Sequence, residues 1–503
     1  MMNKTLVIFL VILQLCCKVN AQEINWVNEL NINLTHIADS LTLNLLPWNV
    51  PSSIYKIEDY GAIANSQTIN TTAIQKTIDA CSKSGGGVVL ISKGNYVTGT
   101  IELKSNVMLE ISKGAKLLGS IDLYDYPEKV ESFKSVMSEF YGFRQSLIYA
   151  EKTSNIGIRG EGEIYFRGEK VNFSGPQTIG KIEGRPLGIR MIECKNIVLQ
   201  DILLRNSAAW MQNYLYCENL IFERIKVINH ANFNNDGLDT DGCRNVIVRN
   251  CFINSEDDAM CLKGAGSRLS ENILIENSTF KSTCNALKIG TDTQGSFKNI
   301  IARNIILGGI SDSSAFQLGD QASTGITLAT VDGGNVENIV ISNVVINQAR
   351  CPIFIRIGNR GRVIEGVEKP IPGYLKHIVI DNIKGTRNYR QGSLITGIPG
   401  YPVKDVIIRN MDLGMEGGGT IEMANLLLPE KEGGYPDAQS FSKSGLPSYG
   451  FYIRHAYNIQ LENVKIYPEI IDYRPPFKLG DDVQNISINK FYTDGSKETN
   501  KDN

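Results

Sequence analysis

Residues 234–264 hold two short groups of acidic residues, and these are the side chains in the sequence best suited to acid–base chemistry. The acids are Asp236, Asp239, Asp241, Glu256, Asp257 and Asp258. Between the groups, apolar and polar residues alternate in the segment 245–253, which is typical of a β-strand with one buried face. The two groups can act together only if the chain folds back on itself with a period close to their separation.

A coiled chain would place these carboxylates on one face. Asp236 precedes Asp257 and Asp258 by roughly one repeat, so stacked coils would bring the three to within about 5 to 10 Å of one another. Crowded like charges raise the pKa of at least one carboxyl group, which supplies an acid beside an ionised base. Two carboxyl groups at that separation can hold a water molecule and a sugar between them, as inverting glycosidases do.

The sequence contains the repeat that such coiling needs. A turn residue, usually Asn, is followed by alternating Ile, Val or Leu, and the phrase returns at intervals of about 25 residues in the middle of the chain. It begins at Asn106, Asn155, Asn196, Asn219, Asn245, Asn272, Asn299, Asn338, His377, Asp405, Asn458 and Asn485. Period-two alternation excludes helical solenoids, and the leucine and asparagine frame of leucine-rich repeats is absent. The pattern predicts an all-β fold, a right-handed parallel β-helix in which the Asn residues form ladders at the turns.

The remaining segments fit one long domain. Residues 1–21 predict a secretory signal peptide, with a lipoprotein at Cys16 as the weaker alternative, and hence a secreted or periplasmic protein. Residues 22–52 predict an N-terminal extension packed on one end, and 53–492 the β-helix catalytic domain. Within it, helical spacing over 71–80, stopped at Gly85–Gly87, predicts a short helix that covers the N-terminal end of the core. Residues 493–503 are polar and predict a disordered tail.

Composition excludes several classes of protein. The 503 residues include 51 basic and 53 acidic side chains, and loss of residues 1–21 would remove Lys4 and Lys18, so the balance is slightly negative. Nucleic acid and anionic membranes are therefore not expected partners. No later segment is apolar enough to span a membrane. Eight cysteines follow residue 21, and they predict buried free thiols, with one or two disulfides as the alternative. The absence of a CxxC pair argues against a metal site. We expect no cofactor and a monomer.

Three cations and one aromatic residue can complete a site. In their strands, Lys263, Lys288 and Arg356 alternate with apolar residues and should point away from the core. Such a column forms either salt bridges on a solvated face or a seat for an anionic sugar. Trp210, one coil earlier, can stack on a sugar ring or pack in the interior.

The chain resembles family 28 of the glycoside hydrolases, the polygalacturonase family, from about Ile57 to the last strands. The family motif Asn-Thr-Asp-Gly appears as Asn234-Asn235-Asp236-Gly237, the next acid as Asp239, and the Asp-Asp pair as Asp257-Asp258. The resemblance implies hydrolysis of α-galacturonosyl links in pectin with inversion. It also implies that Asp257 is the general acid, while Asp236 and Asp258 hold and deprotonate the attacking water.

Two motifs depart from the family pattern. Its Gly-His-Gly element corresponds to Cys284-Asn285-Ala286, and its Arg-Ile-Lys element to Arg356-Ile357-Gly358, so we expect Lys288 to supply the missing charge. The strand pattern and this resemblance together give the substrate-binding candidates Asn285, Lys288, Arg356, Lys263, Asp239, Trp210 and His230, the last of which shortly precedes the first acidic group.

Two other functions remain open at this stage. A β-helical polysaccharide lyase would cleave the same acidic polymers with a Lys or Arg base and usually Ca²⁺, and a non-catalytic solenoid would only bind them. The long insert at 417–449 favours action at a chain end, because it can wall off one end of a cleft.

Overall fold

The computed structural model describes residues 26–493, except 131, 133–135, 137–138, 140, 143, 176–183, 311–319, 364–365 and 442–444. The predicted signal peptide at 1–21 lies outside the described residues, as does the predicted tail apart from Thr493.

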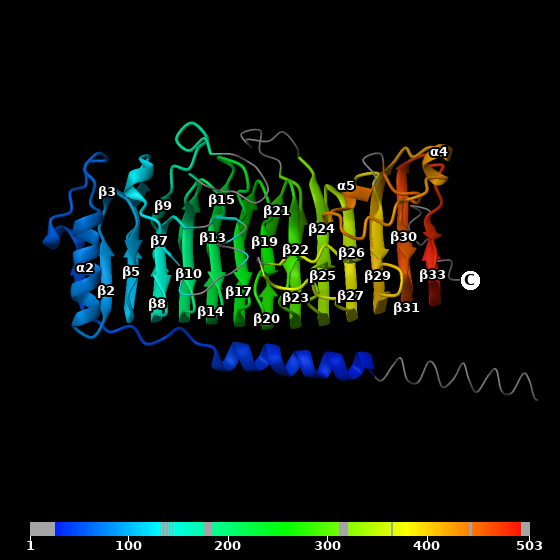
Figure 1. The fold of residues 1–503 in the computed structure, drawn as a ribbon, viewed down its shortest axis with the longest axis horizontal. Helices are drawn as coiled ribbons and strands as arrows, with labels where there is room; N and C mark the ends of the chain where they lie inside the picture. Colours follow the sequence, from blue (N-terminus) through cyan, green and yellow to red (C-terminus); the bar gives the residue numbers. More distant parts are fainter. Residues whose placement is uncertain are drawn as a thin grey trace, which may run out of the picture.

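The described residues form the predicted right-handed parallel β-helix, an elongated stack of coils with every ladder parallel (Figure 1). One sheet contains β4 (Ile101–Glu102), β7 (Ser146–Glu151), β10 (Leu187–Ile192), β13 (Gln212–Leu215), β16 (Leu238–Asp241), β19 (Met260–Gly264), β22 (Asn285–Thr293), β24 (Ala322–Thr330), β26 (Ala349–Ile357), β28 (Ser393–Thr396), β30 (Phe451–Arg454) and β32 (Phe477–Leu479). We call it the site sheet.

The second sheet covers the other sides of the coils. Its strands are β1 (Ile54–Lys56), β2 (Gly87–Ile91), β3 (Gly94–Thr98), β5 (Val107–Ile111), β6 (Ala115–Gly119), β8 (Ser154–Arg159), β9 (Glu163–Tyr165), β11 (Lys195–Gln200), β12 (Leu203–Arg205), β14 (Glu218–Glu223), β15 (Lys226–Asn229), β17 (Arg244–Arg249), β18 (Phe252–Ser255), β20 (Ser270–Glu276), β21 (Thr279–Ser282), β23 (Phe297–Gly308), β25 (Val336–Asn347), β27 (Leu375–Asn388), β29 (Val403–Gly417), β31 (Ala456–Ile470) and β33 (Val483–Tyr492). The short helices outside the sheets are η1 (Ile57–Tyr60), η2 (Leu123–Asp125), α4 (Ile421–Ala424) and α5 (Ala438–Phe441).

The recurring Asn residues do what the sequence predicts. The amide of Asn219 donates to Asn196 at 3.0 Å, that of Asn245 to Asn219 at 3.0 Å, and that of Asn272 to Asn245 at 3.2 Å. Each of these Asn residues also has a positive φ, near 55°, a conformation that Asn tolerates better than most side chains. The ladder therefore turns the chain and fixes the register of successive coils.

A helix closes the N-terminal end of the core, as predicted. Helix α2 (Thr71–Lys83) buries Ile74, Ile78 and Cys81 against the first coil, and Figure 1 shows it at that end of the stack. The glycines after it adopt positive φ, and at Gly86 a Cβ atom would lie 2.4 Å from the carbonyl oxygen of Asn106. A side chain at that position is thus excluded.

The N-terminal extension differs from the prediction. Residues 26–44 form a helix that lies along the outside of the solenoid, across several coils, instead of packing on one end (Figure 1). Its buried residues are Val27, Leu30, Leu34, Ala38 and Leu41, which pack on Ile247, Leu274, Ile301, Val379 and Ile407 of successive strands. The reason is hydrophobic: those strand residues point outward from the core, so their side chains would face water without this helix.

We expect Leu34→Ala to lower the free energy of unfolding by about 2 to 4 kcal/mol, because Leu34 is 3% exposed and its removal leaves a cavity against the strands. Urea denaturation followed by circular dichroism measures the change. The control is Ile32→Ala on the same helix, where the side chain is 58% exposed and little change is expected. Equal effects of the two substitutions would contradict the packing described here.

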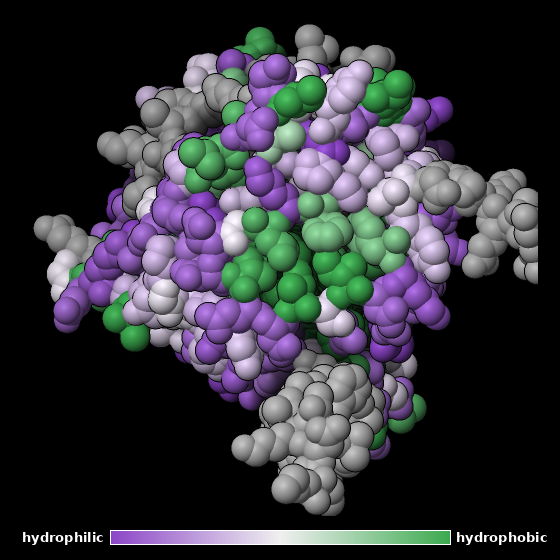
Figure 2. Space-filling view, turned by 90° about the vertical axis from the view of Figure 1, so that its right-hand side faces the viewer, coloured by the Kyte–Doolittle hydropathy of each residue, from purple (hydrophilic) through white to green (hydrophobic). Residues whose placement is uncertain are grey.

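The C-terminal end of the stack presents apolar surface. Phe477, Val483, Ile486, Ile488 and Phe491 pack on the core but are only partly buried, and Figure 2, which views this end, shows a hydrophobic region at its centre. None of the helices in the described residues has the length and apolar composition needed to cross a bilayer.

The cysteines of the described residues are free thiols, which agrees with the first of the two predicted states. All are buried except Cys284, which is partly exposed.

Candidate active site

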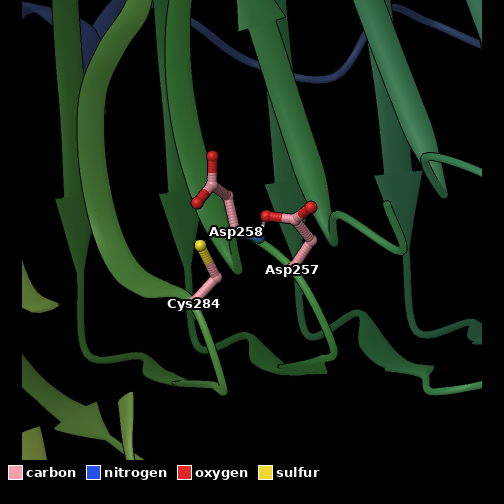
Figure 3. Close-up of side chains that lie close together, drawn as sticks. All are labelled: Asp257, Asp258 and Cys284. Carbon is pink, nitrogen blue, oxygen red and sulfur yellow. Dashed lines mark hydrogen bonds between the residues drawn. The ribbon is translucent and has the colours of Figure 1, made fainter. Parts of the chain in front are cut away.

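The two acidic groups lie on neighbouring coils. The backbone amide of Gly237 donates to the carbonyl oxygen of Asp258 at 2.8 Å, and the backbone amide of Asp257 donates to the carbonyl oxygen of Asn235 at 3.4 Å. Strand β18 ends at Ser255 and β19 begins at Met260, so Asp257 and Asp258 occupy a turn. The turn frees them from the strict alternation of a strand, and Figure 3 shows their carboxyl groups side by side above Cys284 of the next coil.

Adjacent strands of the site sheet supply the other polar groups. Asp241 of β16 pairs in register with Lys263 of β19, whereas Lys288 of β22 pairs with Cys261. The two lysines are therefore offset by two residues and do not form the simple column that the sequence suggested. Both are nearly fully buried, so the alternative of a solvated, salt-bridged face is also wrong.

Lys263 lies at the centre of the cluster. Its Nζ is 3.2 Å from Asp236 Oδ2, 3.6 Å from Asp239 Oδ1 and 3.9 Å from Asp258 Oδ2, and it lies 4.1 Å from the centroid of the Trp210 ring. Although burial lowers the pKa of this ammonium, Asp239 and the other acids raise it well above its usual value. One fixed positive charge thus holds carboxylates from two coils together.

Asp258 has partners on both carboxylate oxygens. Asn285 Nδ2 donates to Oδ1 at 2.6 Å, and Lys288 Nζ donates to Oδ2 at 2.7 Å. Burial alone would raise the pKa of Asp258, but Lys288, Lys263 and these hydrogen bonds lower it below its usual value. The carboxyl group is therefore ionised at neutral pH.

The neighbouring acids are shifted in the opposite direction. Burial, and then the charge of Asp258, raises the pKa of Asp257. Burial and the nearby Asp239 raise the pKa of Asp236 well above its usual value, and burial raises that of Asp239 to about 8 in spite of Lys263. The site thus holds a carboxyl group with a lowered pKa directly beside carboxyl groups whose pKa values are raised.

Asp257 is oriented by a chain of hydrogen bonds. Its Oδ1 accepts from the amide of Asp258 at 3.0 Å, and its Oδ2 accepts from Asn234 Nδ2 at 3.4 Å. Arg185 in turn donates to Asn234 Oδ1 at 2.9 Å. Asp257 is partly exposed while Asp258 is buried, so Asp257 is the acid of the pair nearer to solvent.

Asp257, Asp258 and Cys284 also form the arrangement most compatible with a metal ion, since their ligand atoms all lie within 4.8 Å of one another (Figure 3). The ammonium of Lys288 is already 2.7 Å from Asp258, however, and places a positive charge next to any cation there. The residues thus fit a metal poorly.

Arg356 has a different position from the one predicted. Its guanidinium donates to the carbonyl oxygens of Gly397 at 2.9 Å and Glu430 at 2.9 Å, and it lies 4.8 Å from the ring centroid of Phe441. These contacts attach the insert 417–449 to the site sheet. Arg356 thus supports the insert, and its contacts do not include the acids of the site.

Trp210 and His230 also have structural contacts. The Trp210 ring is 4% exposed and packs on Lys263 and on the Tyr141 ring, 5.6 Å away, which favours the packing role over sugar stacking. His230 Nδ1 lies 3.6 Å from Glu256, one residue before the Asp257-Asp258 pair, so His230 lies behind the acids.

Several residues near the site were not identified from the sequence. Tyr141 donates to Asp292 at 3.0 Å and accepts from Arg362 at 2.7 Å, which joins segments far apart in the chain. Tyr435 of the insert lies over Lys288, with its ring centroid 5.8 Å from Nζ. These residues belong to loops outside the repeat, and no spacing rule links them to the acids. Arg185 also lies outside the repeated phrase.

The fold and the crowded carboxylates define a parallel β-helix with a buried acidic site. The chain belongs to the family described as glycosyl hydrolases family 28, whose model matches residues 81–429. It is 23% identical to a probable polygalacturonase of Vitis vinifera over 71% of this chain and 73% of that protein. It is 26% identical to an exo-poly-alpha-D-galacturonosidase of Dickeya chrysanthemi, over 54% of this chain and 52% of that protein.

Among solved structures, an exopolygalacturonase from Thermotoga maritima has a TM-score of 0.64 at 20% identity, over 86% of this chain and 96% of that one. Family 28 exopolygalacturonase from Yersinia enterocolitica has a TM-score of 0.61 at 18% identity, over 87% of this chain and 78% of that one. These likenesses support the fold. Membership of a hydrolase family also decides against the lyase and the non-catalytic solenoid considered above.

Proposed function

We propose that the protein is an exported hydrolase that cleaves α-linked galacturonosyl bonds of pectic polysaccharides with inversion at the anomeric carbon. The observation that carries the mechanism is the opposite shift of two adjacent carboxyl groups. Asp257 keeps its proton more readily than an ordinary aspartate, and Asp258 is held ionised by Lys288 and Asn285. Adjacent groups with separated pKa values supply an acid and a base in one site.

In this mechanism Asp257 donates its proton to the glycosidic oxygen as the bond to the anomeric carbon breaks. A water molecule attacks that carbon from the opposite face, and Asp258 accepts the proton that the water loses. Asp236, which shares Lys263 with Asp258, holds the water in position. After one turnover Asp257 is ionised and Asp258 protonated, and exchange with solvent restores both.

The charge of the site suits an acidic sugar. Burial raises the pKa values of Asp236, Asp239 and Asp257, which reduces their negative charge, and the ammonium groups of Lys263 and Lys288 lie beside them. These two cations attract a uronate carboxylate in a buried, low-dielectric setting, where such attraction is strong.

The loops on either side of the acids favour action at a chain end. Tyr141, tied to Asp292 and Arg362, packs on Trp210 beside Lys263, and Tyr435 of the insert lies over Lys288. The insert is held firmly, because Arg356 and Arg454 each donate to its carbonyl oxygens. A polymer that extended past the acids in both directions would collide with these segments.

Digestion of polygalacturonic acid tests the proposal. We expect galacturonic acid, or another single short product, from the first minutes, with slow loss of viscosity and with the product released as the anomer opposite to the substrate linkage. Early mass spectra and proton NMR of the anomeric signals measure both. A ladder of oligomers at early times would contradict action at a chain end, and no reducing ends from any of a panel of acidic glycans would contradict the hydrolase itself.

A further inference from the structure

The residue that replaces the family histidine has a hydrogen-bond partner of its own. Thr327, in the middle of β24, donates from Oγ1 to Asn285 Oδ1 at 3.0 Å, and Asn285 donates from Nδ2 to Asp258 Oδ1 at 2.6 Å. Thr327 is 1% exposed, and in the sheet it pairs in register with Lys288. The three side chains form a buried chain across neighbouring coils, from strand β24 to the Asp257-Asp258 turn.

The orientation of the Asn285 side chain matters because its amide has two different ends. The carbonyl end of Asn285 would repel a carboxylate, whereas its NH₂ end binds one. The carboxylate of Asp258 favours the orientation in which NH₂ faces it, and the Thr327 hydroxyl holds the amide there by donating to the carbonyl end. A second contact, from Asn285 Nδ2 to Cys284 Sγ at 3.1 Å, does not discriminate as strongly, because sulfur is a weak partner.

We propose that Thr327 is a positioning residue for the hydrolytic reaction, which fixes the amide of Asn285 so that Asp258 remains an oriented, ionised base. The inference rests on the proposed function for its kinetic consequences. It assigns the orientation of Asp258 to a threonine and asparagine pair supplied by two successive coils of the site sheet.

Thr327→Val tests the inference, since it keeps the shape of the side chain and removes the hydroxyl. We expect kcat to fall about tenfold with little change in KM, because the hydrogen bond to the charged group is weakened while the cleft is unchanged. We also expect the acidic limb of the pH profile of kcat/KM to move upward by about half a unit or more, because an Asn285 amide that is held less firmly donates less well to the ionised form, which raises the pKa of Asp258. Thr327→Ser should restore both values.

A matched control lies on the same strand. Thr324 is also 1% exposed and pairs in register with Asn285, but its Oγ1 has no hydrogen-bond partner within the described part of the chain. Thr324→Val should therefore leave kcat and the pH profile unchanged. If Thr327→Val and Thr324→Val give the same kinetics as the wild type, or lose activity equally, the inference is wrong.

A second measurement separates this inference from the proposed function. Carbon NMR of protein with labelled aspartate side chains follows the titration of Asp258 without any substrate. An increase in the pKa of Asp258 in Thr327→Val, absent in Thr324→Val, supports the positioning role even if no pectic substrate is cleaved. An unchanged pKa of Asp258 in Thr327→Val overturns that role even if the wild type is an active hydrolase.

Discussion

Asp257→Asn should reduce hydrolysis of polygalacturonic acid by about 10³-fold or more while leaving the protein folded. The amide has the size of a protonated carboxyl group, and burial and Asp258 raise the pKa of Asp257, so the substitution imitates the state in which the native side chain is already stable. What it removes is the proton that the leaving oxygen needs. Initial rates of reducing-end formation measure the loss, and thermal unfolding confirms that the fold is intact.

The control for this variant is Asp412→Asn. Asp412 lies on β29 with a side chain that is half exposed, and its Oδ2 is 3.8 Å from Lys465. A surface ion pair of that kind contributes little to stability, so neither rate nor stability should change. Full activity of Asp257→Asn would remove Asp257 from the mechanism proposed here, and equal losses in both variants would point to a general effect on the protein.

Lys263→Met should destabilise the protein by about 3 to 5 kcal/mol at neutral pH and abolish activity. The ammonium lies within 4 Å of three buried carboxyl groups, and without it the ionised Asp258 loses part of the attraction that offsets its burial. Methionine preserves most of the apolar part of the side chain and its contact with Trp210, so the loss of charge dominates.

The pH dependence of that loss has a definite sign. The folded-state pKa of Asp239 is raised to about 8, and that of Asp236 is also raised, so ionisation of these groups costs stability as pH increases above their unfolded values near 4. Removal of Lys263 raises both folded-state pKa values further, so the difference between variant and wild type should grow as the pH rises through about 8, where Asp239 of the folded wild type ionises. Urea unfolding at pH 6 and pH 9 measures it.

Lys298→Met is the control for the pH series, because Lys298 is 41% exposed and pairs with Glu337 on the surface. Its effect should be small at both values of pH. If Lys263→Met lowers the free energy of unfolding by the same amount at the two pH values, the acids of the cluster are not coupled to this lysine.

Much of the fold could be predicted because the repeat carries it. Alternation of period two specified strands, the recurring Asn specified turns, and the spacing brought Asp236 to the coil beside Asp257 and Asp258. Each of these signals is local in the sequence. The convergence of Lys263 and Lys288 on Asp258 was predicted only in outline, because a two-residue offset in register cannot be read from the chain.

The features that the sequence did not predict have physical causes too. Arg356 was assigned to substrate from the strand alternation and the Arg-Ile-Lys resemblance, and its contacts with the insert, which has no repeat, were not foreseen. The position of the N-terminal helix was missed although a signal existed. In successive phrases the middle residue, which should face water, is apolar, as in Ile221, Ile247 and Leu274. A continuous apolar row on an outer surface predicts an element that covers it.

The N-terminal helix affects how the protein unfolds. In a solenoid each coil contacts mainly its neighbours, so coils can fray one at a time from an exposed end. Here one segment of chain joins Trp26, stacked on His377 at 5.2 Å, to Trp48, which packs near Val88 of the first coils. Because this segment contacts distant coils at once, it makes them unfold cooperatively. Removal of the segment should replace one sharp unfolding transition with several gradual ones.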